Sequence, residues 1–295
     1  EGAVERLAGE LGVPLHEVQC SDFERVFASN YGKSAGATLK TQYRMLPPIG
    51  RIVSSAFYDR GLAHGRTKPF ESEAIFPLEL ARPLTWVSTD SAGSSAHQKR
   101  NQSRGQSLYN PVEADAIVAL LRNWSEHEPL IEWLRTRSSG SHPIGIICAY
   151  ADQRDHVWKR LQAENFPDAL RRSIKVDTID SYQGKENLIV VLSLVRNNSD
   201  GPMDGGVKTI APGFMGRKNR INVALSRAMD RLVIIGAKSR WRTGSPMGLV
   251  VEAFAAEVEC GEAAVIDASA LIESSAKARR PGNAKPATKK TKEPT

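Results

Sequence analysis

Residues 188–195, LIVVLSLV, form an almost unbroken apolar run. Strands of a parallel sheet have this composition because helices cover both faces of the sheet. Four further short runs, separated by helical patterns or longer connections, share it: LTWV (84–87), IGII (144–147), SIKV (173–176) and RLVIIG (231–236). We therefore predict an α/β domain with a mostly parallel sheet flanked by helices.

Two helices and two loops can be placed between these runs. Residues 110–113, NPVE, supply an asparagine N-cap, a proline at the first helical position and an acid in the first turn. Within residues 217–229 apolar side chains recur at helical spacing: Ile221, Ala224, Leu225 and Ala228. The long polar stretches 88–107 and 197–213 are predicted to be mobile surface loops.

Composition narrows the class of protein. The 295 residues contain no apolar run of eighteen, and residues 1–10 lack the pattern of a secretory signal. Three scattered cysteines are too few for a disulfide framework or a zinc site, and the sequence offers no metal-binding cluster. We expect a cytoplasmic protein that does not have a membrane as a partner.

The formal net charge of +7 is concentrated at the end of the chain. Residues 273–295 hold seven Lys and Arg against two Glu, a net of +5, which leaves about +2 for the rest. With almost no apolar residues, this segment cannot offset the entropy cost of ordering. We predict that residues 261–295 are a linker and a disordered basic tail, which either attracts phosphates non-specifically or only keeps the protein in solution.

Residues 30–36, NYGKSAG, contain the Gly-Lys-Ser ending of a phosphate-binding loop. Such a loop needs a glycine five positions before Gly32 and a buried strand ahead of it. Phe27 stands at that position, and Phe23, Val26 and Phe27 have helical spacing. We predict a surface turn within a mainly helical segment, 1–36. A self-sufficient kinase that uses this motif is disfavoured.

Tyr43 and Arg44 directly precede a helix that we predict to begin at Pro47 and Pro48. A helix N-terminus favours anions, so an arginine there suits a phosphate and a tyrosine beside it can stack on a base. A structural salt bridge is the alternative role for the arginine.

The segment VDTIDSYQGKEN, residues 176–187, lies between two predicted strands. Ligands of open α/β sheets bind outside the carboxyl ends of the strands. That rule makes four polar residues of this segment candidates, with Gly184 permitting a sharp turn between them: Thr178, Asp180, Gln183 and Glu186. An ordinary polar loop is the alternative.

Arg220 and Arg227 are seven residues apart on the predicted helix 217–229, so both flank its apolar stripe. An arginine in that position can extend past the core into an interface. Solvated surface charge is the alternative.

Together these segments resemble one family. QYRMLPPI (42–49), IGIICAYADQ (144–153), VDTIDSYQGKENLIVVLSLVRNN (176–198) and GFMGRKNRINVALSRAMDRLVIIG (213–236) look, in this order, like the C-terminal half of an Upf-like superfamily one helicase. The resemblance covers roughly residues 20–237.

The resemblance implies that residues 37–260 are a second RecA-like domain and that residues 1–36 are a remnant of, or connection from, a first one. That first domain, absent from this chain, would carry the P-loop and the Mg²⁺-binding acids, so ATP and Mg²⁺ would be bound jointly. Single-stranded DNA or RNA and the N-terminal RecA-like domain are the implied partners. A stand-alone nucleic-acid-binding or adaptor domain without ATP turnover is the alternative.

Roles carry over residue by residue from the resemblance. Arg44 and Arg227 would contact the γ-phosphate as catalytic arginines, and Tyr43 would lie on the adenine side. The implied nucleotide border is Gln183, Gly184 and Glu186, and the implied strand contacts are Thr178, Asp180 and Tyr150. The sequence departs from the family pattern at three places: Cys148-Ala149 for Thr-Pro, Leu46 for His, and Asn219 for Arg.

Overall fold

The computed structural model describes residues 2–14, 18, 22–37, 39–100, 107–138, 140–182 and 184–278, in two compact units, 1–40 and 41–295. The first unit is helical: α1 (Gly2–Leu11), α3 (Asp22–Ala28) and α4 (Asn30–Ala35). The Gly-Lys-Ser motif lies inside α4, where the Lys33 N–H donates to the Ser29 carbonyl at 2.9 Å. Since the helix uses this backbone donor and no strand precedes it in the described part of the unit, the motif is not a phosphate loop.

The second unit is built on a six-stranded sheet with the order β12-β3-β11-β8-β6-β7. Every neighbouring pair is parallel. The strands are β3 (Leu84–Ser88), β6 (Ile144–Cys148), β7 (Ile174–Thr178), β8 (Asn187–Ser193), β11 (Ala228–Gly236) and β12 (Ala263–Asp267). The five apolar runs of the sequence all form strands, so the predicted α/β class with a parallel sheet is confirmed.

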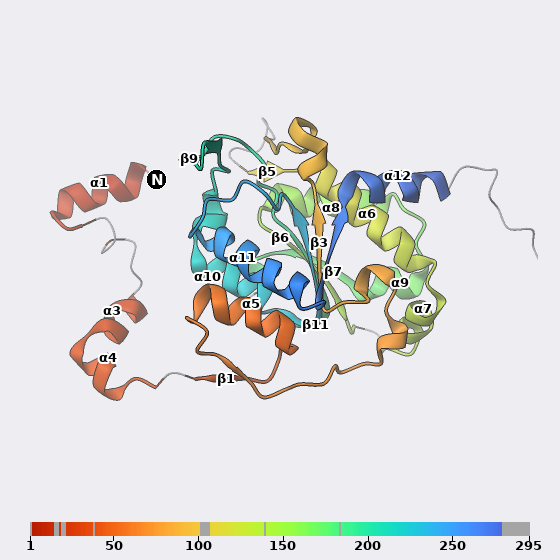
Figure 1. Cartoon of the computed structure of the whole chain (residues 1–295), viewed down its shortest axis with the longest axis horizontal. Helices are drawn as coiled ribbons and strands as arrows, with labels where there is room; N and C mark the ends of the chain where they lie inside the picture. Colours follow the sequence, from red (N-terminus) through yellow and green to blue (C-terminus); the bar gives the residue numbers. More distant parts are fainter. Residues whose placement is uncertain are drawn as a thin grey trace, which may run out of the picture. The chain divides into compact units, whose positions relative to one another are not determined.

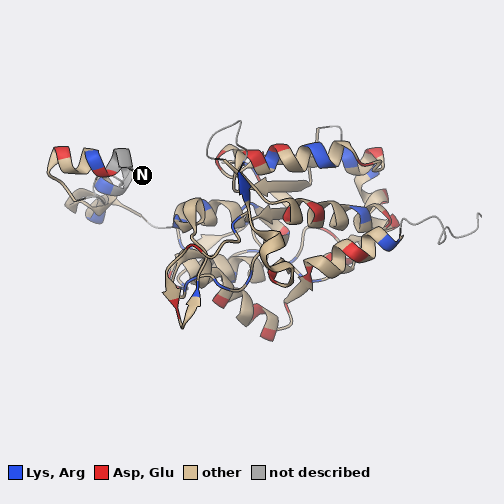
Figure 2. Ribbon diagram, turned by 90° about the horizontal axis from the view of Figure 1, so that it is seen from above, with Lys and Arg blue, Asp and Glu red and all other residues tan. Residues whose placement is uncertain are grey.

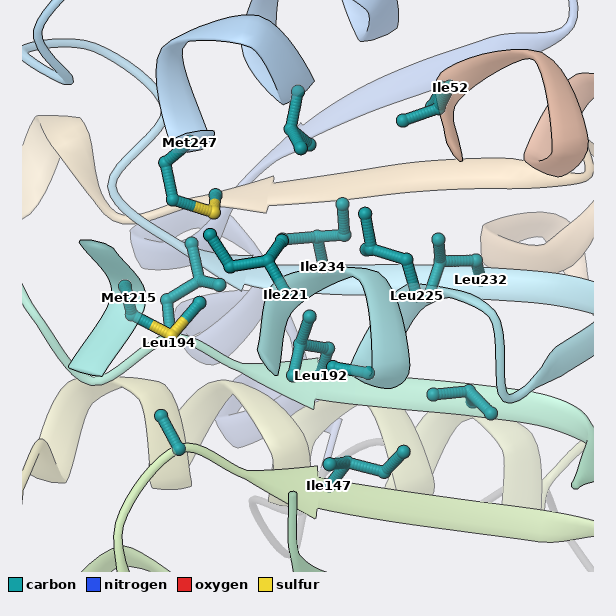
Figure 3. Packing of buried hydrophobic residues seen from close by; sticks show 14 of the residues in the cluster. Ile52, Ile147, Leu192, Leu194, Met215, Ile221, Leu225, Leu232, Ile234 and Met247 are labelled. Atoms are coloured by element: carbon teal, nitrogen blue, oxygen red, sulfur yellow. The ribbon is translucent and has the colours of Figure 1, made fainter. Parts of the chain in front are cut away.

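Alternating side chains of each strand enter two separate cores. On β8, Val190 and Leu192 pack on one face, whereas Ile189 and Val191 pack on the other. Figure 3 shows the first core, in which Leu192 lies beneath Ile221 of a covering helix. This two-sided burial explains the unbroken apolar composition.

Helices cover both faces of the sheet (Figure 1). On the first face lie α5 (Pro47–Phe57), α10 (Lys218–Leu225) and α11 (Pro246–Glu259). On the second face lie α6 (Pro111–Ser125), α7 (Glu128–Arg135), α8 (Ala151–Gln162), α9 (Asp168–Ser173) and α12 (Ala268–Ala278). The helices predicted to begin after Asn110 and at Pro47 are confirmed, and the arrangement is that of a RecA-like domain.

Three short strand pairs lie outside the sheet. They are β1 (Thr41–Gln42) with β2 (Ala63–His64), β4 (Lys99–Arg100) with β5 (Leu108–Tyr109), and β9 (Met203–Asp204) with β10 (Val207–Lys208). Figure 2 shows basic and acidic residues interspersed along the helices, as the small net charge outside the tail predicts. No helix of the described residues is long and apolar enough to cross a bilayer.

Two boundaries and one loop predicted from the sequence are corrected by the structure. The helix predicted over 217–229 ends at Leu225, because Ala228 already pairs with Asn187 as the first residue of β11. The linker predicted from residue 261 is folded up to Ala278, since β12 pairs with β3 and α12 follows it; residues 279–295 lie outside the described residues. The stretch 197–213 is not simply exposed, because Asn197, Thr209 and Ile210 are buried.

Candidate functional site

Arg44, Glu186 and Arg227 come together at the amino ends of β8 and β11, and we call them the arginine cluster. The Arg44 Nε donates to the Glu186 carboxylate, and its Nη1 donates to the Ser226 carbonyl at 3.2 Å. The side chains of Arg44 and Glu186 are 34% and 46% exposed. The cluster therefore faces solvent while its geometry is fixed by protein contacts.

Arg227 lies in the short connection between α10 and β11. Its Nε donates to the Val223 carbonyl and its Nη1 to the Lys185 carbonyl, both at 3.0 Å. Burial lowers its pKa, the Arg44 charge lowers it further, and Glu186 opposes the shift. Two guanidinium groups are thus held close enough to repel each other, an arrangement that an anion between them would relieve.

The backbone of Arg44 is tied to β11. The Arg66 guanidinium donates to the Arg44 carbonyl at 2.5 Å and to the buried Asp230 carboxylate at 2.7 Å. The Leu46 N–H donates to the Met229 carbonyl at 2.9 Å. These contacts hold the segment before α5 on β11, the strand that begins directly after Arg227.

Three further residues were predicted to contact the nucleotide: Tyr43, Gly184 and Gln183. Tyr43 is 69% exposed, with its ring against Gly65. Gly184 has φ +82°, which glycine adopts without strain, so its predicted sharp turn is confirmed. Gln183 lies outside the described residues.

A second site lies at the opposite edge, where β6 and β7 end. Its pocket of about 330 Å³ is lined mainly by Tyr150, Thr178, Asp180, Phe214 and Arg220, and we call it the carboxyl-edge pocket. Thr178 and Asp180 lie there as predicted. Phe214 was missed, although its neighbour Gly213, at φ +51°, marks the backbone turn that presents it.

Aromatic rings and guanidinium groups alternate along this pocket. The Arg220 guanidinium lies 4.4 Å from the Phe214 ring centre and donates to the Asp180 carboxylate at 3.0 Å. The Phe214 and Tyr150 rings are 5.2 Å apart, and the Arg196 Nε donates to the Tyr150 hydroxyl at 2.8 Å. Groups of this kind stack on nucleobases and neutralise phosphates.

The two sites lie at opposite ends of the strands, contrary to the expectation that Glu186 would join Thr178 at the carboxyl edge. Because β7 and β8 both run parallel to β6, the chain between Thr178 and Asn187 must return the length of a strand. Helix α10 also runs between the sites, from Arg220 towards Arg227. The segment 179–186 and helix α10 therefore connect the pocket with the arginine cluster.

Comparison with known proteins identifies the family. A protein-family model described as an AAA domain matches residues 18–239, more than half of the chain. The "ATP-dependent helicase NAM7" of Saccharomyces cerevisiae is 28% identical over 239 residues. The chain belongs to the Upf-like superfamily one helicases.

Among further relatives of this Upf-like chain, the "Regulator of nonsense transcripts 1 homolog" of Neurospora crassa is 29% identical over 205 residues. The "5'-3' DNA helicase ZGRF1" of Mus musculus is 28% identical over 218 residues. The match to NAM7 covers 79% of this chain and 21% of NAM7. The match to the Neurospora protein covers 67% of this chain and 16% of that protein. The match to ZGRF1 covers 72% of this chain and 10% of ZGRF1. The chain thus spans about a fifth or less of each relative.

Proposed function

We propose that this chain is the C-terminal motor half of an ATP-dependent nucleic-acid helicase. It would supply Arg44 and Arg227 to an ATP site shared with a first RecA-like domain, and a face for single-stranded DNA or RNA. The observation that carries the proposal is the convergence of these two guanidinium groups beside Glu186, at the far end of two elements that begin at the carboxyl-edge pocket.

The arginine cluster fits a phosphate chain. Burial is the main cause of the lowered pKa of Arg227, and the charge of Arg44 adds to it. An anion between the two guanidinium groups would therefore lower the energy of both. This chain and the first RecA-like domain would bind ATP and Mg²⁺ together. ATP would supply the γ-phosphoryl group that is transferred to water. Among the described residues no cluster of three His, Cys, Asp or Glu could hold a metal ion.

Each residue of the cluster would have a separate role. The Arg227 fork would donate to oxygens of the γ-phosphate and stabilise the charge that develops during hydrolysis. Arg44 would exchange Glu186 for phosphate oxygens. Tyr43 would stack on the adenine, while Gln183, Gly184 and Glu186 would border the nucleotide.

The strand would lie across the carboxyl-edge pocket. Thr178 would donate to a backbone phosphate, Tyr150 would offer a ring, and Asp180 would hold Arg220 in place. Contacts of this kind read backbone and base faces, so they suit DNA and RNA alike. Closure around ATP would shift the 179–186 segment and α10 and so move the strand. A cytoplasmic location stays a prediction from the sequence.

The complete protein, with its first RecA-like domain, tests the proposal. We expect ATP hydrolysis that single-stranded oligonucleotides stimulate, and a double variant Arg44→Ala/Arg227→Ala that still binds a fluorescein-labelled oligonucleotide but has lost hydrolysis. Thr178→Ala should show the reverse pattern, with weaker strand binding. Strand binding without hydrolysis by the complete wild-type protein would instead identify an adaptor.

A further inference from the structure

Val195, two residues after the end of β8, has an unusual backbone. Its φ is +69°, in the left-handed region, and its side chain is fully buried. A β-branched residue is strained there, because its Cβ approaches the neighbouring carbonyl. Such a conformation persists only where the surrounding structure imposes it.

The first turn of α6 holds both polar groups of the Val195 backbone. The Val195 N–H donates to the Glu113 Oε2 at 2.9 Å, and the Val195 carbonyl accepts from the Asn110 Nδ2 at 3.1 Å. The Ser193 hydroxyl donates to the same Glu113 oxygen at 2.6 Å. Gln153 of α8 donates to the Ser193 oxygen at 3.0 Å. All four of these polar side chains are buried.

The next residue carries this geometry to the carboxyl-edge pocket. Arg196 donates to the Tyr150 hydroxyl at 2.8 Å, and its guanidinium fills the space where a side chain at position 213 would lie. Gly213 precedes Phe214, whose ring faces Tyr150. Arg196 therefore braces both aromatic walls of the pocket from behind, and it can do so only while Val195 keeps its turn.

We propose that Glu113 is a positioning residue for strand binding: it holds Val195 in the left-handed conformation, so that Arg196 fixes Tyr150 and Phe214 for a single strand. This inference rests on the proposed strand-binding role of the pocket. Glu113 itself does not line the pocket, and its effect on the strand passes through Val195 and Arg196.

The protonation of Glu113 offers a readout that ordinary packing would not give. Burial raises its pKa to about 8, and the hydrogen bonds from Ser193 and Val195 oppose the shift. The groups that face it are the uncharged Asn110, which donates to its Oε1 at 3.3 Å, Ser193 on β8 and, on β6, the Cys148 thiol, whose pKa burial also raises. The ionised carboxylate would still accept both hydrogen bonds, but its charge would be buried among uncharged groups. Ionisation therefore favours water entry that separates Glu113 from Val195.

Strand affinity of this chain should therefore fall as the pH rises from 7 to 9. The experiment measures anisotropy of a fluorescein-labelled oligothymidylate and an oligouridylate against pH, with thermal melting in parallel. We expect the wild type to weaken severalfold across this range. Glu113→Gln, which mimics the neutral acid, should bind like the wild type at pH 7 and keep that affinity at pH 9. Glu113→Ala should bind weakly at every pH.

A second variant keeps the inference falsifiable if Glu113→Ala does not fold. Tyr150→Phe removes the hydroxyl that Arg196 holds but keeps the ring, and it should weaken binding severalfold with an unchanged melting temperature. Trp158→Phe, an exposed aromatic on α8, is the matched control. Equal strand affinities for the wild type, Glu113→Gln and Tyr150→Phe at every pH would overturn the inference alone. A wild-type chain that binds neither oligonucleotide would overturn the proposed strand-binding role as well.

Discussion

The two edges of the sheet are built on different physical principles. At the carboxyl edge, aromatic rings are braced by a buried, hydrogen-bonded network around Glu113. At the amino edge, two arginines repel each other across one partly exposed carboxylate. A site held by packing keeps its shape without a ligand, whereas an anion relieves two like charges that are held close together.

The largest expected effect is at the amino edge. In the complete protein, Arg227→Lys keeps the charge but loses the planar fork that donates two hydrogen bonds at once. Arginine fingers contribute on the order of 10³ to 10⁵ in rate, and we expect most of that to be lost in single-turnover hydrolysis. Strand affinity should change little.

Arg171→Lys, at an exposed position on α9, is the control for Arg227→Lys. Near-wild-type hydrolysis by Arg227→Lys would reduce Arg227 to a brace between α10 and β8, and the two edges would then differ less than we propose. In that case Arg227→Ala should mainly lower the melting temperature.

The next effect concerns the stability of the carboxyl edge. The pKa of Glu113 is raised from 4.5 to about 8 in the folded chain, so between these values the folded state keeps a proton that the unfolded state releases. The free energy of unfolding should fall as the pH rises through this window, by an amount on the order of a few kcal/mol. Glu113→Gln should flatten the dependence in urea titrations at pH 5, 6, 7 and 8. Parallel curves for the two proteins would contradict the buried neutral acid.

A smaller effect is expected from the end of the chain. Residues 279–295 carry six Lys and Arg and one Glu, so removing them takes away a net charge of +5 but leaves α12 intact. Strand affinity should fall several-fold at low salt and its salt dependence should flatten, because fewer counterions are released. An unchanged salt slope would assign all phosphate contacts to the folded part.

The smallest effect should come from Lys33. This chain alone should show no ATP hydrolysis above background, and in the complete protein Lys33→Ala should leave hydrolysis unchanged, because Lys33 lies within helix α4. Turnover by the chain alone that depends on Mg²⁺ and disappears with Lys33→Ala would overturn the proposal that the phosphate loop belongs to another domain.

The sheet could be predicted from the sequence because burial on both faces leaves a local signal, as in residues 188–195. Strand β12 left none, because AAVID is short and gains its place only through pairing with β3, far away in the chain. The residue at which α10 ends could not be predicted either, because Ala228 fits the apolar spacing of that helix equally well. Only its pairing with Asn187 shows that Ala228 belongs to β11.

The sequence pointed to residues that the structure brings together, but not to their arrangement. Motif resemblance pointed to Arg44, Glu186 and Arg227, yet the strand-end rule placed Glu186 at the wrong edge because it ignores where a parallel crossover must return. Phe214 and Glu113 were missed as site residues. The first depends on a glycine turn, and the second acts through the backbone of Val195, 82 residues away.

Strand β3 has a consequence for how the polypeptide is made. Both of its partners, β11 and β12, lie more than 140 residues further along the chain. At ribosomal rates of about 5–20 residues per second, residues 84–88 wait roughly seven to thirty seconds before either partner emerges. During that time a nascent segment containing Trp86 and Val87 has neither edge covered, so we expect it to be where holding chaperones bind the growing polypeptide.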